Sequence, residues 1–361
     1  MSSSRSTTRR PIHMRRAAAG TAGLVHNRFV LSDWRPTVSL EALRIRAGIL
    51  GAIRDFFAER GVLEVETPLL AAAPVTDVHL QALSTRYRGP GHDEGLELWL
   101  QTSPEFAMKR LLAASSGPIY SLGKAFRDGE AGSRHNPEFT LLEWYRPGWD
   151  HHRLMDEVEA LIVAVLGSSG RVSGSGSGSG QRLTYAEAFR RHAGVDPFHD
   201  PVAALANRAA ELLGHAPPDL GDDRDAWLEL LLSHAVEPQL GRGRPTFVFD
   251  FPASQAALAR IRPGDPPVAE RFELFLEGVE LANGYHELGD PAEQRRRFEA
   301  DLAERRVRGL LEVPVDERLL AALAHGLPDC AGVALGVDRL VMLAAGASRI
   351  DQVIAFPVDR A

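Results

Sequence analysis

The 361-residue sequence has a single cysteine, Cys330, and no apolar run of the roughly 18 residues that a membrane-spanning helix needs. One cysteine excludes a disulfide bond within the chain and a zinc site built from cysteines, and this scarcity favours a reducing cytoplasm. No repeat of solenoid length is present either. The sequence is therefore not that of a membrane protein, a disulfide-stabilised domain or a repeat array.

Excess positive charge is also lacking, because the formal net charge is −7. The chain as a whole thus offers no general attraction for nucleic acid. Residues 1–35 differ, with seven arginines, one acidic residue and little apolar periodicity, and they are predicted to be a disordered tail. We interpret this tail as a plain extension or an over-extended start with Met14 as an alternative first residue. A transit peptide or a nucleic-acid arm is less favoured, because no apolar or amphipathic segment accompanies the arginines.

The first periodic segment is residues 40–60, where apolar residues recur at intervals of three and four. Ser39 is the expected N-cap and Gly61 follows the end, so the pattern predicts an amphipathic helix. A short strand comes next and ends at Pro68. A helix, a strand and a proline in this order form a compact unit, but the pattern is common and by itself indicates little about function.

A second strand is predicted to end at Gln101 and to lead into another helix. Ser103 is the expected cap and Pro104 the first helical residue. Glu105 then lies in the first turn, where the helix dipole alone explains a carboxylate. The alternative is that Glu105 faces a pocket and binds an amine.

Residues 126–145, FRDGEAGSRHNPEFTLLEWY, contain the densest cluster of polar groups. The β-branched and aromatic runs on either side predict two antiparallel strands joined by a glycine-rich, charged loop. Such a loop presents Arg127, Arg134, His135 and Asn136 over one face of a sheet, an arrangement that suits a polyphosphate.

The strand after this loop has three residues of interest. Phe139 offers a flat apolar ring. Glu143 and Tyr145 are two residues apart and so point to the same face, where a carboxylate beside a phenol can hold an ammonium group. Taken singly, such charges are as often surface residues of a hairpin, and only their density favours a site.

The middle of the chain contains a low-complexity segment. An acidic amphipathic helix is predicted from Arg153 to about Leu166, and residues 167–181 then read as a flexible glycine and serine linker. Residues 184–235 have helical patterns and no strand signal. We expect them to be an insertion that decorates the same domain.

The sheet is predicted to resume with TFVFDFP at residues 246–252 and to continue through RFELFLEGVELANGYHEL at residues 271–288. Glu273, Glu280, Asn283 and Glu287 recur there among apolar residues. Carboxylates on neighbouring strands repel one another unless a cation lies between them, and magnesium is the natural candidate. The alternative is that one or two of these glutamates face solvent.

The last motif, CAGVALGVDRLVMLAAG, predicts a glycine-spaced strand that enters an apolar helix through Asp338 and Arg339. Gly332 and Gly336 permit close backbone approach, and an arginine at a helix start can reach phosphate. Before it, residues 291–308 predict a charged surface helix. With the hairpin and the glutamates, this motif would complete one nucleotide site.

Together, GVLEVETP, FRDGE…RHNPEFTLLEWY and GVALGVDRL resemble motifs 1, 2 and 3 of the class II aminoacyl-tRNA synthetases, in their lysyl branch. The resemblance covers roughly residues 35–361. It is closest to the paralogues that attach β-lysine to elongation factor P, through TSPEFAMKRLL, HNPEFTLLEWYRP, FPASQAALA, ELANGYHEL and PDCAGVALGVDRLVML. It implies an α+β catalytic domain over residues 36–361, with an antiparallel sheet flanked by helices, that dimerises through motif 1.

The resemblance also implies a reaction: ATP and Mg²⁺ would activate (R)-β-lysine or lysine as an adenylate, and a lysine side chain of elongation factor P would accept it. The anticodon-binding β-barrel of lysyl-tRNA synthetases has no counterpart in the roughly forty residues before the first helix, so tRNA is not the expected acceptor. Two alternatives stay open. One is a lysine-activating enzyme that acts on tRNA or another acceptor, and the other is an inactive regulatory paralogue.

By matching position, the resemblance assigns roles to individual residues. Arg127 would grip the α-phosphate and Arg339 the γ-phosphate, and both are expected to be catalytic. The ATP-binding residues would be Arg127, Asp128, Gly129, Glu130, Asn136, Phe139, Glu280, Leu281, Gly336 and Arg339. The amino-acid pocket would comprise Ser103, Pro104, Glu105, Glu143, Tyr145, Asn283, Glu287 and Ala334. The magnesium ligands would be Glu273 and Glu280.

Two positions depart from the lysyl-tRNA synthetase pattern. The family usually has Arg-x-Glu in motif 2, whereas here Gly129 holds the place of that glutamate and Glu130 follows. Either Glu130 contacts the adenine amine instead, or backbone groups read the base. Ala334 stands where lysyl-tRNA synthetases typically have glycine, and its added methyl group changes which amine geometry fits.

Overall fold

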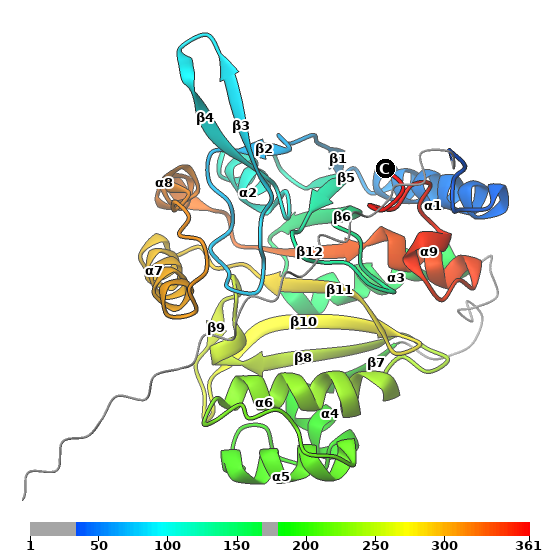
Figure 1. Cartoon of the computed structure of the whole chain (residues 1–361), viewed down its shortest axis with the longest axis vertical. Helices are drawn as coiled ribbons and strands as arrows, with labels where there is room; N and C mark the ends of the chain where they lie inside the picture. The colour runs from blue at the N-terminus through cyan, green and yellow to red at the C-terminus, as the bar shows by residue number, and fades with distance from the viewer. Residues whose placement is uncertain (1–33, 168–179) are drawn as a thin grey trace, which may run out of the picture.

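The computed structural model describes residues 34–167 and 180–361, so the arginine-rich tail and most of the predicted linker lie outside the described residues. Within these ranges one large sheet contains β1 (Leu63–Glu64), β5 (Ile119–Phe126), β6 (Glu138–Pro147), β7 (Gln181–Thr184), β8 (Thr246–Pro252), β9 (Ile261–Arg262), β10 (Val268–Leu276), β11 (Val279–His286) and β12 (Cys330–Gly336). Their order is β1-β5-β6-β12-β11-β10-β8-β7, with β9 beside β10 (Figure 1). In the described chain only β1–β5 and β7–β8 pair in parallel, which confirms the predicted antiparallel α+β sheet.

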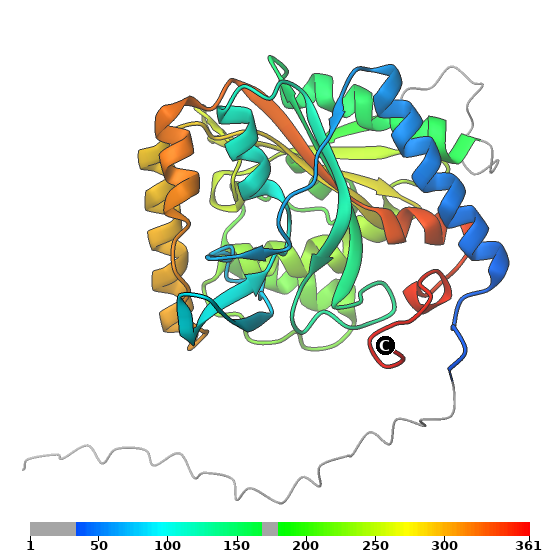
Figure 2. The same ribbon diagram turned by 90° about the horizontal axis from the view of Figure 1, so that it is seen from above.

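Helices cover both faces and one end of this sheet. They are α1 (Leu40–Glu59), α2 (Glu105–Ala113), α3 (His151–Leu166), α4 (Tyr185–His192), α5 (Val202–Leu213), α6 (Arg224–Leu231), α7 (Pro291–Val307), α8 (Glu317–Gly326) and α9 (Val337–Ala345). Helices α1, α3 and α9 share the largest apolar core with one face of the sheet. Helices α7 and α8 lie side by side at the opposite side of the molecule from α1 (Figure 2).

The first helix follows the predicted pattern closely. Ser39 caps α1, because its Oγ accepts a hydrogen bond from Ala42 N at 3.1 Å. Apolar residues at helical spacing are buried on one face, and among them Phe57 stacks on Tyr120 of β5 with ring centroids 4.5 Å apart. Motif 1 is thereby attached to the central hairpin through an aromatic contact.

The predicted hairpin of motif 2 is confirmed. Strands β5 and β6 pair antiparallel from Ile119 opposite Tyr145 to Phe126 opposite Glu138. Strand β12 of motif 3 lies on the other side of β6, where Gly332 faces Tyr145. The three motifs, far apart in sequence, are therefore neighbours in the sheet.

One expectation about the middle of the chain is wrong: the sheet does not resume only at residue 246, because β7 already pairs in parallel with β8. The charged helix α7 lies at the surface as predicted, and Gln294, Phe298 and Arg305 form its buried face. Arg305 donates to the Asp77 carbonyl and to Gln81 Oε1, both at 2.9 Å.

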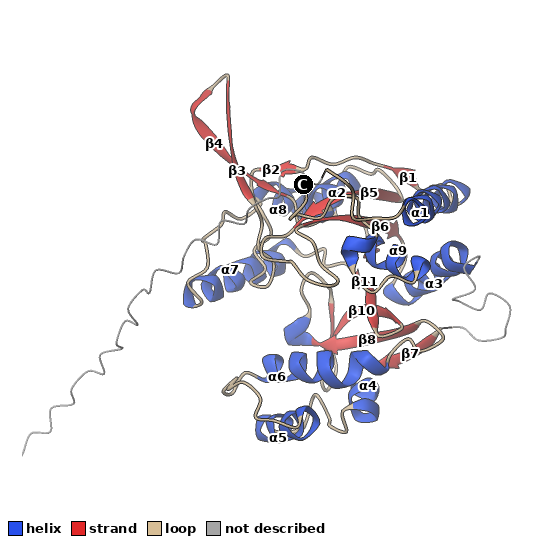
Figure 3. Ribbon diagram, turned by 45° about the vertical axis from the view of Figure 1, so that its right-hand side comes forward, coloured by secondary structure: helices blue, strands red, loops and turns tan. Residues whose placement is uncertain are grey.

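The remaining elements sit at the periphery. Helices α4, α5 and α6 of the predicted insertion build a second apolar core against β8 and β10, and lie together below the sheet in Figure 3. A small sheet of β2 (Leu70–Ala71), β3 (Ser84–Gly89) and β4 (His92–Leu100) projects from the body (Figure 1). Short helical turns are η2 (Leu232–Val236), η3 (Glu237–Gln239), η4 (Ala253–Gln255) and η5 (Ile350–Gln352). Among the residues described, no helix is long and apolar enough to cross a membrane.

Candidate active site

A cavity of about 1220 Å³ opens on the face of the sheet opposite α3. Its floor follows from strand alternation: Glu143 and Tyr145 line the cavity, whereas Leu142 and Trp144 lie in the core with α3. The cavity brings together most of the residues predicted to form the site. These are Ser103, Glu105, Arg127, Glu130, Asn136, Phe139, Glu143, Tyr145, Glu273, Glu280, Leu281, Asn283, Glu287, Ala334, Gly336 and Arg339. Pro104, Asp128 and Gly129 do not line it.

Glu143 lies at the carboxylate-rich end of the cavity, where the amino acid is expected to bind, and is 2% exposed. Ser103 Oγ donates to one carboxylate oxygen at 2.7 Å, and Tyr145 Oη donates to the other at 2.6 Å. Burial raises the pKa of Glu143 to about 8, with repulsion from Glu105 adding to the shift. Two hydrogen bonds thus fix the Glu143 carboxyl group, but the described residues place no positively charged side chain against it.

Lys109, which the sequence analysis missed, supplies a cation beside it. Its Nζ lies 2.6 Å from Glu105 Oε1 and 2.6 Å from Glu287 Oε2, and the side chain is only 1% exposed. Burial alone would lower the pKa of Lys109, but the two carboxylates raise it overall, so the amine is charged. Glu105 therefore does bind an amine, that of the lysine one helical turn further on. Helix α2 begins at Glu105, one residue later than predicted, and Ser103 Oγ accepts from Glu105 N at 3.1 Å.

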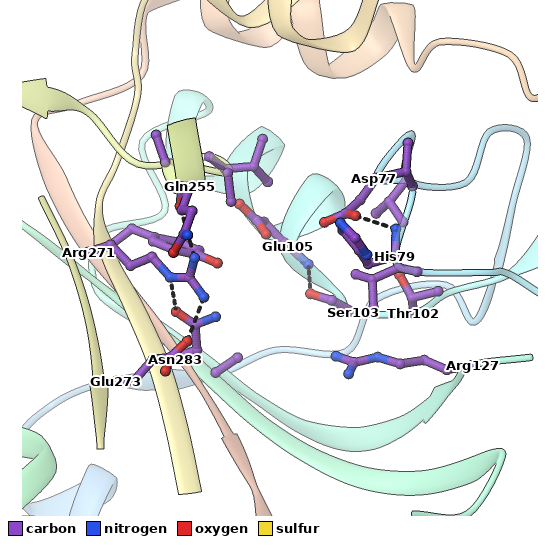
Figure 4. A pocket seen from close by; sticks show the side chains of 18 of the residues that line it. Asp77, His79, Thr102, Ser103, Glu105, Arg127, Gln255, Arg271, Glu273 and Asn283 are labelled. Carbon is purple, nitrogen blue, oxygen red and sulfur yellow. Dashed lines mark hydrogen bonds and ion pairs between the residues drawn. The ribbon is translucent and has the colours of Figure 1, made fainter. Parts of the chain in front are cut away.

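Arg271 is a second buried cation that the sequence analysis missed. Its guanidinium lies 2.5 Å from Glu273 Oε1, donates to Asn283 Oδ1 at 3.2 Å and donates to the Gln255 carbonyl at 2.9 Å. Figure 4 shows this group on one side of the cavity and Arg127 on the other. Arg271 thus fixes two predicted site residues that stand opposite each other on β10 and β11.

The predicted magnesium ligands Glu273 and Glu280 lie close to other carboxylates. Burial raises the pKa of Glu273 to about 8, although Arg271 opposes the shift, and Glu280 and Glu237 add to it. Burial and Glu280 likewise raise the pKa of Glu237 to about 7. Mg²⁺ prefers carboxylate oxygens, and the raised pKa values indicate an excess of carboxylates here even though Glu273 pairs with Arg271 and Glu280 with Arg339, so these two residues would fit this ion.

The end of the cavity away from Glu143 contains the basic side chains of motifs 2 and 3. Arg339, in the first turn of α9, donates to the Glu280 carbonyl at 2.8 Å, and its other nitrogen lies 2.7 Å from His135 Nε2. Burial, followed by the charge of Arg339, lowers the pKa of His135. The Arg127 guanidinium lies 5.0 Å above the Phe139 ring. Two arginines and a flat ring at one end suit a nucleotide.

The motif 2 loop carries the departure noted in the sequence. Gly129 has a φ of +76°, which favours glycine, and Glu130 turns toward Arg127, with the closest atoms of the two side chains 3.6 Å apart. Asn136 fastens the loop, since its Nδ2 donates to the Glu138 carbonyl at 2.6 Å and its Oδ1 accepts from Val358 N at 3.0 Å. Glu130 therefore lies in the cavity beside Arg127.

Gly332 on β12 lies directly against Tyr145 and Glu287 at the carboxylate-rich end of the cavity. A Cβ at this position would lie 2.3 Å from Tyr145 Cε1 and 2.5 Å from Glu287 Oε1. No side chain fits there without moving a buried ring. Nearby, Ala334 stands between Glu143 on β6 and Asn283 on β11, so its methyl group faces the pocket.

Comparison with known proteins agrees with this geometry. The family model of class II tRNA synthetases (D, K and N) matches residues 24–360. The chain belongs to this family. The match spans the sheet and the residues that line the cavity.

Three curated proteins are more than half identical to this chain. Proteins of Vibrio cholerae, Yersinia enterocolitica and Salmonella enteritidis are 56%, 54% and 52% identical to this chain, each over 330 residues. The alignments cover 91% of this chain and 99% of each relative. All three carry the name elongation factor P–(R)-β-lysine ligase.

One polar network joins α1 to motifs 2 and 3 behind the site. Asp338 Oδ1 lies 2.6 Å from an Arg46 nitrogen on α1, and Asp338 Oδ2 accepts from Thr140 N of β6 at 2.6 Å. Arg46 also donates to Thr140 Oγ1 at 2.6 Å. Because Arg339 follows Asp338 directly, this network sets the start of α9 and the position of the arginine beside the nucleotide end.

Proposed function

We propose that this class II synthetase uses ATP to activate (R)-β-lysine, or lysine, and transfers it to a lysine side chain of elongation factor P. The name and the identity of the relatives support the acceptor and the product. The observation that carries the proposal is the carboxylate-rich end of the cavity, where Glu105, Glu143 and Glu287 come together and Lys109 is the one ammonium group that the described residues place against them. Two carboxylates in excess match a substrate with two ammonium groups.

In the first step, the substrate carboxylate attacks the α-phosphorus of ATP, an aminoacyl adenylate forms, and pyrophosphate leaves. Arg127 and Arg339 stabilise the charge that develops on the phosphates, because both guanidinium groups border the cavity. Glu273 and Glu280 would hold magnesium, which supplies further positive charge to the phosphates when bound.

In the second step, the amine of the acceptor lysine attacks the adenylate carbonyl carbon. An amide bond forms, the bond to phosphate breaks, and AMP leaves with the electron pair while the amine loses a proton. No residue of the enzyme has to bond covalently to the substrate. The role of the site is to hold the reactants together and to neutralise charge.

The enzyme is also expected to have a particular oligomeric state, acceptor and cellular location. We expect a homodimer formed through α1 and β1, since β1 is an edge strand of the large sheet and Leu40 and Leu63 are exposed there. We expect a protein acceptor and no role for tRNA. A translation factor as acceptor places the reaction in the cytoplasm.

The proposal is tested by amino-acid-dependent exchange between ATP and pyrophosphate with lysine and with both enantiomers of β-lysine, followed by addition of elongation factor P. We expect exchange to be best with (R)-β-lysine and the acceptor to gain the mass of one lysyl group. Exchange without a mass change, together with charging of tRNA, would favour a truncated tRNA-acting enzyme. No exchange with any of these amino acids would favour an inactive paralogue.

A further inference from the structure

A second cluster of ligand-type side chains lies on the other face of the sheet, away from the cavity. His151 begins α3, Glu270 is on β10 and His286 ends β11. One nitrogen or oxygen from each of the three lies within 4.8 Å of the others. His286 comes between Tyr285 and Glu287, which line the cavity, so strand alternation points it toward α3.

His151 is the member of this cluster that most needs a partner. The residue is 2% exposed, and neither Nδ1 nor Nε2 has a hydrogen-bond partner among the described residues. A buried imidazole without a partner is costly and uncommon. Its ring is roughly parallel to that of His286, with the ring centroids 6.3 Å apart, so both rings border the same space.

His286 is already oriented as a metal ligand would be. One ring nitrogen, Nε2, lies 2.9 Å from Asp329 Oδ1, and Asp329 in turn pairs with Arg260. The other nitrogen, Nδ1, faces Glu270 Oε2 at 2.7 Å. A carboxylate that holds one nitrogen of a histidine while the other faces a ligand site is the usual outer-shell arrangement of protein zinc sites.

We propose that His151, Glu270 and His286 form a structural site for a divalent transition-metal ion of the zinc type. Two imidazoles and one carboxylate favour such an ion over magnesium or calcium, which prefer oxygen ligands throughout. Tetrahedral zinc with bonds of about 2.1 Å needs ligand atoms about 3.4 Å apart. The three groups, at present within 4.8 Å, reach that spacing through side-chain shifts of about 1 to 1.5 Å.

The electrostatic setting balances this cation. The start of a helix repels positive charge, and His151 is the first residue of α3. Glu270 as a ligand supplies one negative charge and the capping residue Asp150 a second, whereas the charge of Asp329 behind His286 is shared with Arg260. A bound ion would tie α3 to β10 and β11, and the other face of these strands carries Arg271, Glu273 and Asn283 into the cavity.

The test is Co²⁺ binding to the full chain after removal of metal by a chelator, followed by visible absorption. Excess Mg²⁺ is present throughout so that Glu273 and Glu280 do not take up the probe. We expect one Co²⁺ per chain, displaced by one Zn²⁺, and X-ray absorption of the zinc form showing two imidazoles in an all-nitrogen and oxygen shell. His151→Gln and Glu270→Gln should each weaken binding at least tenfold, whereas the matched control His152→Gln should bind as the parent chain does.

The proposal is overturned if the parent chain takes up no Co²⁺, if the zinc form lacks imidazole ligands, or if both variants bind as tightly as the control. The last result would mean an adventitious ion only. Because the spectroscopy is done on the parent chain, a misfolded variant does not remove the test. None of these readouts depends on ligase activity, so the result is independent of the proposed function.

Discussion

At the scale of single residues, the amino-acid end of the cavity depends on charge that is only partly compensated. Lys109 bridges the buried Glu287 and the partly buried Glu105, whereas the hydrogen bonds that Glu143 receives from described side chains come from neutral hydroxyl groups. A buried ion pair contributes little net stability when intact but is costly to break, because the remaining charge stays buried. Lys109 is therefore a sensitive position for both stability and substrate binding.

Lys109→Met should lower the free energy of unfolding by about 3–5 kcal/mol, since Glu105 and Glu287 then lack a cation. Urea unfolding of the substrate-free protein measures this loss. The matched control is Lys124→Met, whose pair with Glu138 is solvent-exposed and should cost less than about 1 kcal/mol. Equal losses of unfolding free energy in the two variants would show that the buried ion pairs of Lys109 stabilise the fold no more than an exposed pair does.

Gly332→Ala should raise the KM for the amino acid, because the new methyl group overlaps Tyr145 and Glu287. We expect the KM for ATP to change little, and stability to fall by about 1–3 kcal/mol from overpacking. Steady-state kinetics in the exchange assay separates the two KM values. Gly123→Ala on β5 is the control, since its Cβ would meet nothing within 4 Å. A variant in which both KM values rise equally would contradict this assignment.

Sequence reasoning found the carboxylates of this site but not its buried cations. Glu143 and Tyr145 were predictable because strand alternation places them on one face. Lys109 was not, since a glutamate four residues before a lysine is typical of an exposed helix. Arg271 sits at the start of an apolar run, and only the pairing of β10 with β11 brings it to Glu273 and Asn283.

At the scale of elements, local patterns predicted the helices and strands of the three motifs, and long-range pairing decided the rest. The hairpin β5–β6 has strong alternation and a glycine-rich loop. Strand β7 has four residues beside a linker, too few for a pattern, and it becomes a strand only because β8 offers it an edge. Helix α7 has so many charges that its buried stripe of Gln294, Phe298 and Arg305 was hidden.

One ion pair joins α1 to α9 beside their shared apolar core. Arg46→Met leaves Asp338 buried with only its hydrogen bond from Thr140, so we expect a loss of about 3 kcal/mol in unfolding free energy and a rise in the KM for ATP. Arg54→Met on the same helix is the control, because its pair with Glu64 is exposed and should be worth less than about 1 kcal/mol. An unchanged KM for ATP in Arg46→Met would show that Arg339 is positioned without this network.

At the scale of the whole molecule, a carboxyl buried without a cation couples folding to pH. Burial, assisted by Glu105, raises the pKa of Glu143 from an ordinary 4.5 to about 8 in the folded chain. Between these values the folded state holds a proton that the unfolded state has lost. Stability that is fully present below about pH 4.5 is therefore lost as pH rises toward 8, by at most about 1.4 kcal/mol per pH unit for one group.

Glu143→Gln removes this titration, so the stability of the variant should fall less steeply than that of the parent chain between pH 6.5 and 8. The window lies below the raised pKa of Glu143 and above that of an ordinary carboxyl, and the comparison with the parent chain cancels groups that titrate in both proteins. Urea unfolding across the window measures both slopes. Glu138→Gln, exposed on the same strand, should keep the parent slope. Parallel slopes for the parent and Glu143→Gln would mean that Glu143 is ionised in the free enzyme and that the substrate ammonium meets a charged carboxylate from the start.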